Sequence, residues 1–370
     1  MINTIDLFDA IDSGRKGNNK GISTGIEKLD DYIGGIQKGI YYLIFSGSGS
    51  GKSSLALYSY IYRPLKDNPD KDITLLYYSM EMSERVLLSK LLGLYVYEEF
   101  NVILSFKDIM SWKNPLSDEN YQYLLKAREW LDSISSKLII YDKTLNRDSF
   151  YHQAMKVLED NGEFVESKDG LRTIYNPYNK NKLLIGVIDH ISLVVPKSGS
   201  TRKDEMDAIS AYAVTLREKC QFTWVFLQQE NRNVNNMDRR KADLLEPDAS
   251  DLKDSGCMYN DSNVCISIFN PLQHKLKTHD KYPIIIENSE DSFIGFRDRY
   301  RCLFIIKNRE GEPNKKIPVN FFGEIGYWKQ FPKMEDINNP LDYIYLNKNT
   351  YKEETKDEVI EPKKEIIYKF

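Results

Sequence analysis

The sequence predicts an α/β fold in which helices flank a mostly parallel central sheet. Over the first two thirds of the chain, apolar runs typical of buried strands alternate with amphipathic segments typical of helices. Such repeated units imply a parallel sheet that is covered on both faces. The strand-like runs are 40–45, 73–79, 138–142, 183–189 and 223–229, and the helical patterns between them are 53–62, 84–96, 149–160 and 207–220.

Beyond residue 260 the pattern changes character. The apolar runs there are 263–269, 301–308, 316–323 and 326–331. Turn residues separate these runs, and no long helical pattern lies between them. We therefore expect antiparallel strands that extend the same sheet toward the C-terminus.

Length and composition limit the class of protein. With 370 residues and 41% hydrophobic content, the chain can bury one large core or two smaller ones. The formal net charge is −4, so any nucleic-acid site must be a local cluster of basic side chains. The four cysteines lack metal-site spacing and are expected to be core thiols. No apolar run is long enough to span a bilayer, so we expect a cytoplasmic protein, a phage protein in its host cytoplasm included.

The chain divides into an arm, a core and a tail. Residues 1–20 are polar and end in GRKGNNK, which predicts a flexible arm before a core at 21–332. The end of the chain, 333–370, is expected to be a charged, disordered tail, because from Asn347 onward it mixes charges with few apolar residues until its last five. Within the core, 161–181 and 271–298 are expected to be insertions, and the first has the pattern of a β-hairpin.

A phosphate-binding loop follows the first strand-like run. The motif SGSGSGKS lies between an apolar strand and a helical segment, which is the context that a P-loop requires. Its glycines let backbone N–H groups turn toward phosphates, Lys52 supplies a positive charge, and the Ser53 hydroxyl can bind Mg²⁺. Ser46 stands where the motif usually has glycine. The residues expected to contact ATP are Ser46, Gly47, Ser48, Gly49, Ser50, Gly51, Lys52, Ser53 and Ser54.

Two acidic residues are candidates to complete an ATPase site. Asp189 ends the strand-like run 183–189, where a carboxylate can hold Mg²⁺. Glu81 follows the run 73–79 at the carboxyl edge of the sheet, where it can activate the attacking water. Each has a plainer explanation, because many buried strands end in aspartate and Glu81 can simply precede the N-cap of the next helix.

These motifs resemble the ATPase domain of the DnaB-like replicative helicases, which has a RecA-like P-loop fold. The resemblance extends from Gly21 to Phe331 and rests on blocks in a fixed order. They are STGIEKLDD before the P-loop, YYSMEMSE around Glu81, VIDHISLV at Asp189, LQQENR at Gln229, DLKDSGCMYNDSN from Asp251, and FIIKNREG with Lys307 and Arg309. The order makes this resemblance more specific than a P-loop alone.

The resemblance implies a role for each matching residue. It implies that Glu81 activates water, that Asp189 helps to hold Mg²⁺, and that Gln229 senses the γ-phosphate. Lys307 and Arg309 would reach into the ATP site of a neighbouring subunit. Because residues two apart on a strand share a face, this pair can form a charge clamp, although a solvated edge strand would look the same.

The resemblance also implies a function and partners. It implies a hexamer that hydrolyses ATP, moves 5′ to 3′ on single-stranded DNA and unwinds the duplex during replication, with a primase or a helicase loader as partner. The basic residues of two polar loops are candidates for DNA contact, or else ordinary solvated side chains. They are Lys197, Arg202 and Lys203 after Asp189, and Arg232, Arg239, Arg240 and Lys241 after Gln229.

Two other functions stay open at this point. The roughly 20 residues before Gly21 are too few for the helical domain that commonly precedes this ATPase core. A RecA-like or KaiC-like DNA-dependent ATPase that does not unwind duplex is therefore an alternative. A regulatory module that holds ATP as a structural ligand is a third, but it would need neither a base such as Glu81 nor a clamp such as Lys307 and Arg309.

Overall fold

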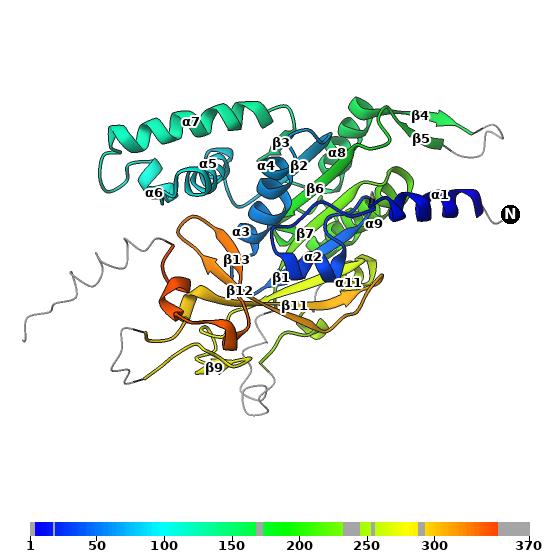
Figure 1. Ribbon diagram of the computed structural model, residues 1–370. Coiled ribbons are helices and arrows are strands. Elements are labelled where there is room, and N and C mark those ends of the chain that lie inside the picture. The colour runs from blue at the N-terminus through cyan, green and yellow to red at the C-terminus, as the bar shows by residue number, and fades with distance from the viewer. Residues whose placement is uncertain are drawn as a thin grey trace, which may run out of the picture.

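Nine strands of the described residues form one mixed sheet at the centre of the computed structural model (Figure 1). The structure describes residues 4–17, 19–167, 173–231, 245–252, 256–287 and 293–346. Across the sheet the strands are β13 Tyr327–Gln330, β12 Lys315–Phe322, β11 Tyr300–Asn308, β8 Val264–Phe269, β1 Tyr41–Ser46, β7 Thr223–Gln229, β6 Leu183–Asp189, β2 Ile73–Ser79 and β3 Leu138–Tyr141.

The predicted fold class is confirmed, with one strand oriented differently from our expectation. The pairs from β3 to β8 are parallel, and β11, β12 and β13 add antiparallel pairs. We expected β8 to be antiparallel, but it runs parallel to β1 and antiparallel only to β11. The reason is a crossover: after β7 the chain returns to the amino-terminal edge, where the Asn263 N–H donates to the Tyr41 carbonyl at 2.8 Å before β8 begins.

Helices cover both faces of the parallel strands. The α-helices of the described residues are α1 Thr4–Arg15, α2 Glu27–Ile33, α3 Lys52–Leu57, α4 Arg63–Asp67, α5 Glu84–Phe100, α6 Phe106–Ile109, α7 Asp118–Ile134, α8 Arg147–Asn161, α9 Arg202–Cys220 and α11 Gly256–Asp261. A π-helical turn, η1 Tyr58–Tyr62, joins α3 to α4. Short 3-10 turns are η2 Ile191–Leu193, η4 Ala249–Asp251, η5 Arg297–Arg299, η6 Met334–Asp336 and η7 Pro340–Tyr343.

The alternation of side chains along each strand divides the core into two layers. In β1, Tyr42 and Ile44 face the helices α2 to α5, whereas Tyr41, Leu43 and Phe45 face α8, α9 and α11. Every residue of β1 is buried. A strand that is apolar on both faces needs cover on both sides, and this is why its sequence reads as a continuous apolar run.

The two insertions form small sheets of their own. The hairpin predicted in 161–181 is confirmed as β4 Gly162–Glu166 paired antiparallel with β5 Thr173–Pro177. The stretch 271–298 contains the short pair β9 Thr278–His279 and β10 Tyr282–Pro283. Its residues Tyr282, Ile284 and Phe296 pack with β11 in a third apolar cluster.

The ends of the chain differ from our expectation. Helix α1 lies within the segment expected to be a flexible arm. Residues 333–346, expected to belong to a disordered tail, fold onto the core: the Tyr343 ring stacks on Phe331 at 5.3 Å and its carbonyl accepts a bond from Asn320 Nδ2 at 2.6 Å. The rest of the tail, 347–370, lies outside the described residues. Cys257 is exposed and is therefore not a core thiol.

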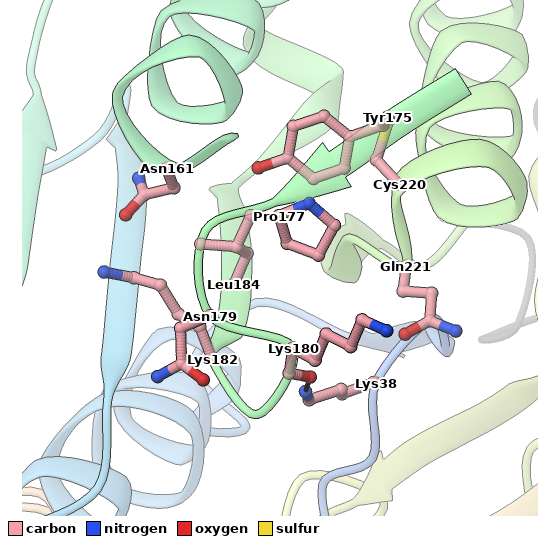
Figure 2. Close-up of a pocket in the computed structure, with 10 residues that line it drawn as sticks. All are labelled: Lys38, Asn161, Tyr175, Pro177, Asn179, Lys180, Lys182, Leu184, Cys220 and Gln221. Atoms are coloured by element: carbon pink, nitrogen blue, oxygen red, sulfur yellow. Dashed lines mark hydrogen bonds between the residues drawn. The ribbon is translucent and has the colours of Figure 1, made fainter. Parts of the chain in front are cut away.

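A pocket at the base of the hairpin is structural in character (Figure 2). Lys38 Nζ donates to the Lys180 carbonyl there, and beside it Lys182 pairs with Asp72 at 2.9 Å. The pocket has a volume of about 30 Å³, which is too small for a nucleotide, and none of the predicted site residues lines it.

Within the described residues, none of the helices combines the length and the apolar content that crossing a bilayer requires.

Candidate active site

The parallel strands bring the predicted ATPase residues to one edge of the sheet. Ser46, the last residue of β1, pairs in register with Gln229, the last residue of β7. Ser79 at the end of β2 pairs in the same way with Asp189 at the end of β6. Because carboxyl ends of parallel strands meet at one edge, the loops that follow them share one site.

The P-loop turns sharply between β1 and α3. Gly49 and Gly51 have φ of 74° and 104°, which residues with a Cβ rarely adopt. Lys52 begins α3, and its ammonium donates to the carbonyls of Ser46 at 2.8 Å and Gly47 at 3.1 Å. Burial lowers the pKa of Lys52 to about 8, against the opposing charges of nearby carboxylates. The lysine is therefore held beside the loop in a poorly hydrated setting.

Asp189 lies directly beside the P-loop helix. Its side chain is buried, and Oδ1 accepts a bond from Ser53 Oγ at 2.9 Å while Oδ2 accepts one from Tyr77 at 2.7 Å. Burial raises the pKa of Asp189, and the two hydroxyl donors oppose that change. The sequence had indicated Ser53 and Asp189 separately, and the structure brings them into contact. Tyr77 was not predicted, since a tyrosine inside a buried strand carries no distinctive pattern.

Glu81 stands at the open side of the same edge. It follows β2 in a turn, and its side chain is exposed. Burial raises the pKa of Asp189, and the negative charge of Glu81 raises it further. The same charge opposes the lowering of the pKa of Lys52 and of His190 by burial. The structure thus brings Glu81 within electrostatic reach of the predicted Mg²⁺ ligands. Lys90 of α5, not predicted, feels the charges of Asp189 and Glu81 as well, and burial lowers its pKa.

Gln229 and its neighbour lie next to the P-loop. Gln229 is exposed at the end of β7, and the N–H of Glu230 donates to the Ser46 carbonyl at 3.0 Å. The Glu230 carboxylate lies close to Gly47. Its negative charge opposes the lowering of the Lys52 pKa by burial. Glu230 was not among the predicted site residues, although it is part of the LQQENR block.

Two further contacts to the P-loop come from the antiparallel half of the molecule. Gln273, in the insertion 271–298, donates through Nε2 to the Ser48 carbonyl at 2.9 Å. Arg301 of β11 donates through Nε to the Ser50 carbonyl at 3.2 Å. These partners are 225 and 251 residues apart in the sequence, so no local pattern could have indicated them.

Lys307 and Arg309 lie toward the opposite edge of the sheet, where the Arg309 N–H donates to the Asn263 carbonyl at 2.9 Å. Both donate to the carbonyl of Asn260 near the end of α11, Lys307 at 3.0 Å, so the two side chains lie close together. Lys307 pairs in register with Cys265 near the start of β8. Cys265 in turn pairs with Leu43 of β1, so Lys307 lies three residues, or roughly 10 Å, along the strand direction from Ser46, and β8 lies between β11 and β1. The pair therefore does not contact the P-loop of its own chain.

The basic residues proposed for DNA contact are only partly described. Lys197 forms an ion pair with Asp148 of α8. Arg202 and Lys203 are exposed but lie in the first turn of α9, and not in a loop as expected, because Thr201 caps the helix just before them. The other four, Arg232, Arg239, Arg240 and Lys241, lie outside the described residues.

Comparison with known proteins gives a consistent family match. The model of the DnaB-like helicase C terminal domain matches residues 21–330. The replicative DNA helicase DnaB of Helicobacter pylori strain 26695 is 25% identical over 318 residues, which are 80% of this chain and 57% of that protein. The DnaB of Leifsonia xyli subsp. xyli is 23% identical over 314 residues, 84% of this chain and 56% of that protein. The chain thus spans a little over half the length of these relatives.

Solved structures show the same fold. A solved ATPase domain superposes with a TM-score of 0.65 at 19% identity, covering 89% of this chain and 97% of that one. A DnaB-like replicative helicase, solved in a study of its interactions with primase, gives a TM-score of 0.65 at 20% identity, covering 88% of this chain and 66% of that one. The likeness extends over the mixed sheet and its helices.

Proposed function

Because the chain belongs to the DnaB-like helicase C-terminal domain family, we propose that it hydrolyses ATP to move along single-stranded DNA and to separate duplex DNA during replication. The observation that carries the proposal is the hydrogen bond of 2.9 Å between Ser53 Oγ and Asp189 Oδ1, directly after the P-loop. It joins the two groups that an ATPase of this type needs around its metal ion. Replicative DNA helicases among its relatives support the choice of reaction.

The donor set next to the P-loop fits Mg²⁺. Ser53 and Asp189 offer oxygen atoms, which this small, hard cation prefers, and we propose that they hold it. When bound, Mg²⁺ neutralises charge on the β- and γ-phosphates. Lys52 adds a positive charge, and the N–H groups of the P-loop orient the phosphates.

Glu81 and Gln229 complete the proposed site within one chain. Glu81 is an exposed carboxylate whose charge reaches Asp189, which suits a base that accepts a proton from the attacking water. Gln229 ends the strand next to the P-loop strand, so its amide is well situated to respond to the γ-phosphate. We propose that this response is passed to the segment that follows β7.

Lys307 and Arg309 are proposed to act on the ATP site of a neighbouring copy in a hexamer. Their contacts support this assignment, since both side chains donate to carbonyls near the end of α11 and not to the P-loop of their own chain. Two cations aimed at the transferring phosphoryl group would stabilise its charge.

We further propose that Lys197, Arg202 and Lys203 contact the DNA backbone, together with the four basic residues after Gln229. Arg202 and Lys203 are exposed at the start of α9 and can bind phosphates without reading bases. A primase is the proposed protein partner, because the solved DnaB-like replicative helicase was studied with primase; a helicase loader is the other partner that we expect. The proposed location is the cytoplasm.

The test measures ATP hydrolysis with and without single-stranded DNA, strand displacement and oligomeric mass in the same buffers. We expect DNA to stimulate turnover, the mass to reach that of a hexamer, and Arg309→Ala to lower hydrolysis by about 1000-fold while nucleotide binding is kept. The matched control is Arg128→Ala, an exposed arginine on α7. DNA-stimulated hydrolysis without strand displacement would favour the RecA-like or KaiC-like ATPase. A monomer that is indifferent to DNA and to Arg309→Ala would overturn the proposal.

A further inference from the structure

The backbone carbonyls of the P-loop need donors of their own. A loop that turns its N–H groups toward an anion turns its C=O groups toward the protein, where each needs a partner. The carbonyls of Ser46 and Gly47 accept bonds from Lys52, and that of Gly51 accepts one from Leu55 N. The carbonyls of Ser48 and Ser50 instead depend on side chains from the antiparallel half of the molecule.

Arg301 supplies the donor for Ser50 at a considerable cost in solvation. Its side chain is 1% exposed, and burial lowers the pKa of its guanidinium. Besides the bond to Ser50, it donates to the carbonyls of Asp298 and Tyr300 at 2.8 Å and pairs with the Asp298 carboxylate at 2.8 Å. That carboxylate is itself 70% exposed, so the counter-charge is only partly buried. A buried cation with such limited compensation is rare unless it has a use.

An aromatic pair fixes Arg301 relative to the P-loop. The guanidinium lies over the Phe321 ring at 5.2 Å, and Phe321 stacks on Trp328 at 4.3 Å. A Cβ at Gly51 would come within 2.8 Å of the Trp328 ring, so this aromatic pair is in close contact with the loop. The arginine, the two rings and the glycine are therefore packed directly against one another.

The two carbonyls that these side chains hold belong to two particular peptide groups. The Ser48 carbonyl shares a planar peptide with the N–H of Gly49, and the Ser50 carbonyl shares one with the N–H of Gly51. A hydrogen bond to a carbonyl fixes the plane of its peptide and polarises the N–H on the other side. Gln273 and Arg301 thus orient and polarise the N–H groups of Gly49 and Gly51 through the carbonyls of Ser48 and Ser50.

We propose that Arg301, assisted by Gln273, is a positioning residue that orients and polarises the P-loop N–H groups for the phosphates of the nucleotide. The inference rests on the proposed function, since it needs a nucleotide at this loop. It assigns a role in ATP binding to the antiparallel strands and to the insertion 271–298.

The experiment titrates a fluorescent ADP analogue onto the full chain and follows steady-state ATP hydrolysis. Arg301→Met, which loses a charged donor, should raise the Kd by about 10-fold and raise KM for ATP more than it lowers kcat. Arg301→Lys, which keeps the charge, should recover part of the affinity. Gln273→Ala, at an exposed position, should raise the Kd by about 3-fold. Lys275→Gln in the same turn is the matched control and should leave the Kd unchanged.

The outcomes separate this inference from the function on which it rests. If the wild type does not bind the analogue, or if Lys52→Ala binds it equally well, the proposed function fails. If the wild type binds but Arg301→Met and Gln273→Ala both stay within twofold of its Kd, the inference is overturned and the function stands. Should Arg301→Met fail to fold, Gln273→Ala and Arg301→Lys decide the matter.

Discussion

The two edges of the central sheet carry charge in different ways. At the carboxyl edge, Lys52 and Asp189 are held by fixed partners of their own chain, and burial shifts the pKa of each. At the amino edge, Lys307 is half-buried and donates to the carbonyls of Tyr259 and Asn260, and burial lowers its pKa, whereas Arg309 is exposed and donates to the Asn260 carbonyl. Buried charges require fixed partners, whereas exposed cations can exchange a carbonyl for another acceptor at little cost. The carboxyl edge is thus assembled within the chain, whereas Arg309 at the amino edge can change its acceptor, as the proposed contact with a neighbouring copy requires.

The largest combined effect, on nucleotide binding as well as on hydrolysis, is expected at the carboxyl edge. Lys52→Ala should lower ATP hydrolysis by about 1000-fold, because it removes the positive charge beside the phosphates. Nucleotide affinity should be measured alongside ATP hydrolysis, and we expect Lys52→Ala to lower both. A variant that hydrolyses ATP within tenfold of the wild type would break the comparison, since the buried lysine would then be only structural. The thermal unfolding temperature serves as the control for folding.

At the amino edge, Lys307→Ala is expected to have a smaller effect, which is confined to turnover. Lys307→Ala should lower turnover by about 100-fold and leave the Kd for nucleotide unchanged, because its ammonium is bound to the carbonyls of Tyr259 and Asn260 and not to the P-loop of its own chain. The control is Lys315→Ala on β12, whose partner is the exposed Glu312. Equal losses of binding and turnover in Lys307→Ala would show that the two edges do not differ in the proposed way.

The stability of the carboxyl edge can be tested through Glu205 of α9. This buried carboxylate accepts bonds from Arg147 and Ser200 and so holds the loop before α9. The hydrogen bonds from Arg147 lower the pKa of Glu205 to about 2. Glu205→Gln should cost about 2 kcal/mol at neutral pH, less than for a fully buried pair because Arg147 is partly exposed.

The pH dependence of this contribution follows from the direction of the shift. A lowered folded pKa stabilises the protein above the ordinary glutamate value and loses that effect as pH falls from about 4.5 to about 2. Chemical denaturation of wild type and Glu205→Gln should therefore converge at the acid end of this window. Glu159→Gln, an exposed position on α8, is the control, and a constant difference between wild type and Glu205→Gln down to pH 2 would contradict the prediction.

The smallest effect is the pH dependence of nucleotide binding. Burial lowers the pKa of Lys52 to about 8, so the free protein loses this charge above pH 8, and an anionic ligand must restore a proton when it binds. The Kd for ADP should therefore rise above pH 8, by at most about tenfold per pH unit. Lys52→Arg keeps its charge in this range and should show no such rise. A flat wild-type profile from pH 7 to 9.5 would contradict the prediction.

The sequence could predict the features that depend on residues close together in the chain. Each strand of the main sheet and the motif from Ser46 to Ser53 are local patterns, so their positions could be predicted. Asp189 and Glu81 could be assigned to one edge because parallel strands end there together. The direction of β8 could not, because it depends on a crossover that carries the chain back to Tyr41.

The interactions that the sequence could not predict join distant parts of the chain. Tyr77, Gln273 and Arg301 reach the site across long stretches of sequence and lie in otherwise ordinary segments. We expected the segment 333–346 to belong to the charged tail, yet half of its residues are apolar or aromatic, and side chains such as Tyr343 anchor it to the core. Composition averages over a segment, whereas packing depends on the individual side chains that find a cavity in the core.

The separation of the two edges also sets how active sites are counted. In the proposed ring, each complete site takes its P-loop from one copy and its Lys307 and Arg309 from the next, so the catalytic unit is the junction between two chains. Two inactive variants, one damaged at each edge, would then complement each other when mixed. If the two variants alternate around the ring, every second junction has an intact P-loop and an intact Lys307 and Arg309, and the junctions between have neither. Complementation between inactive variants would thus follow from the placement of Lys307 and Arg309 near the end of α11, away from the P-loop of their own chain.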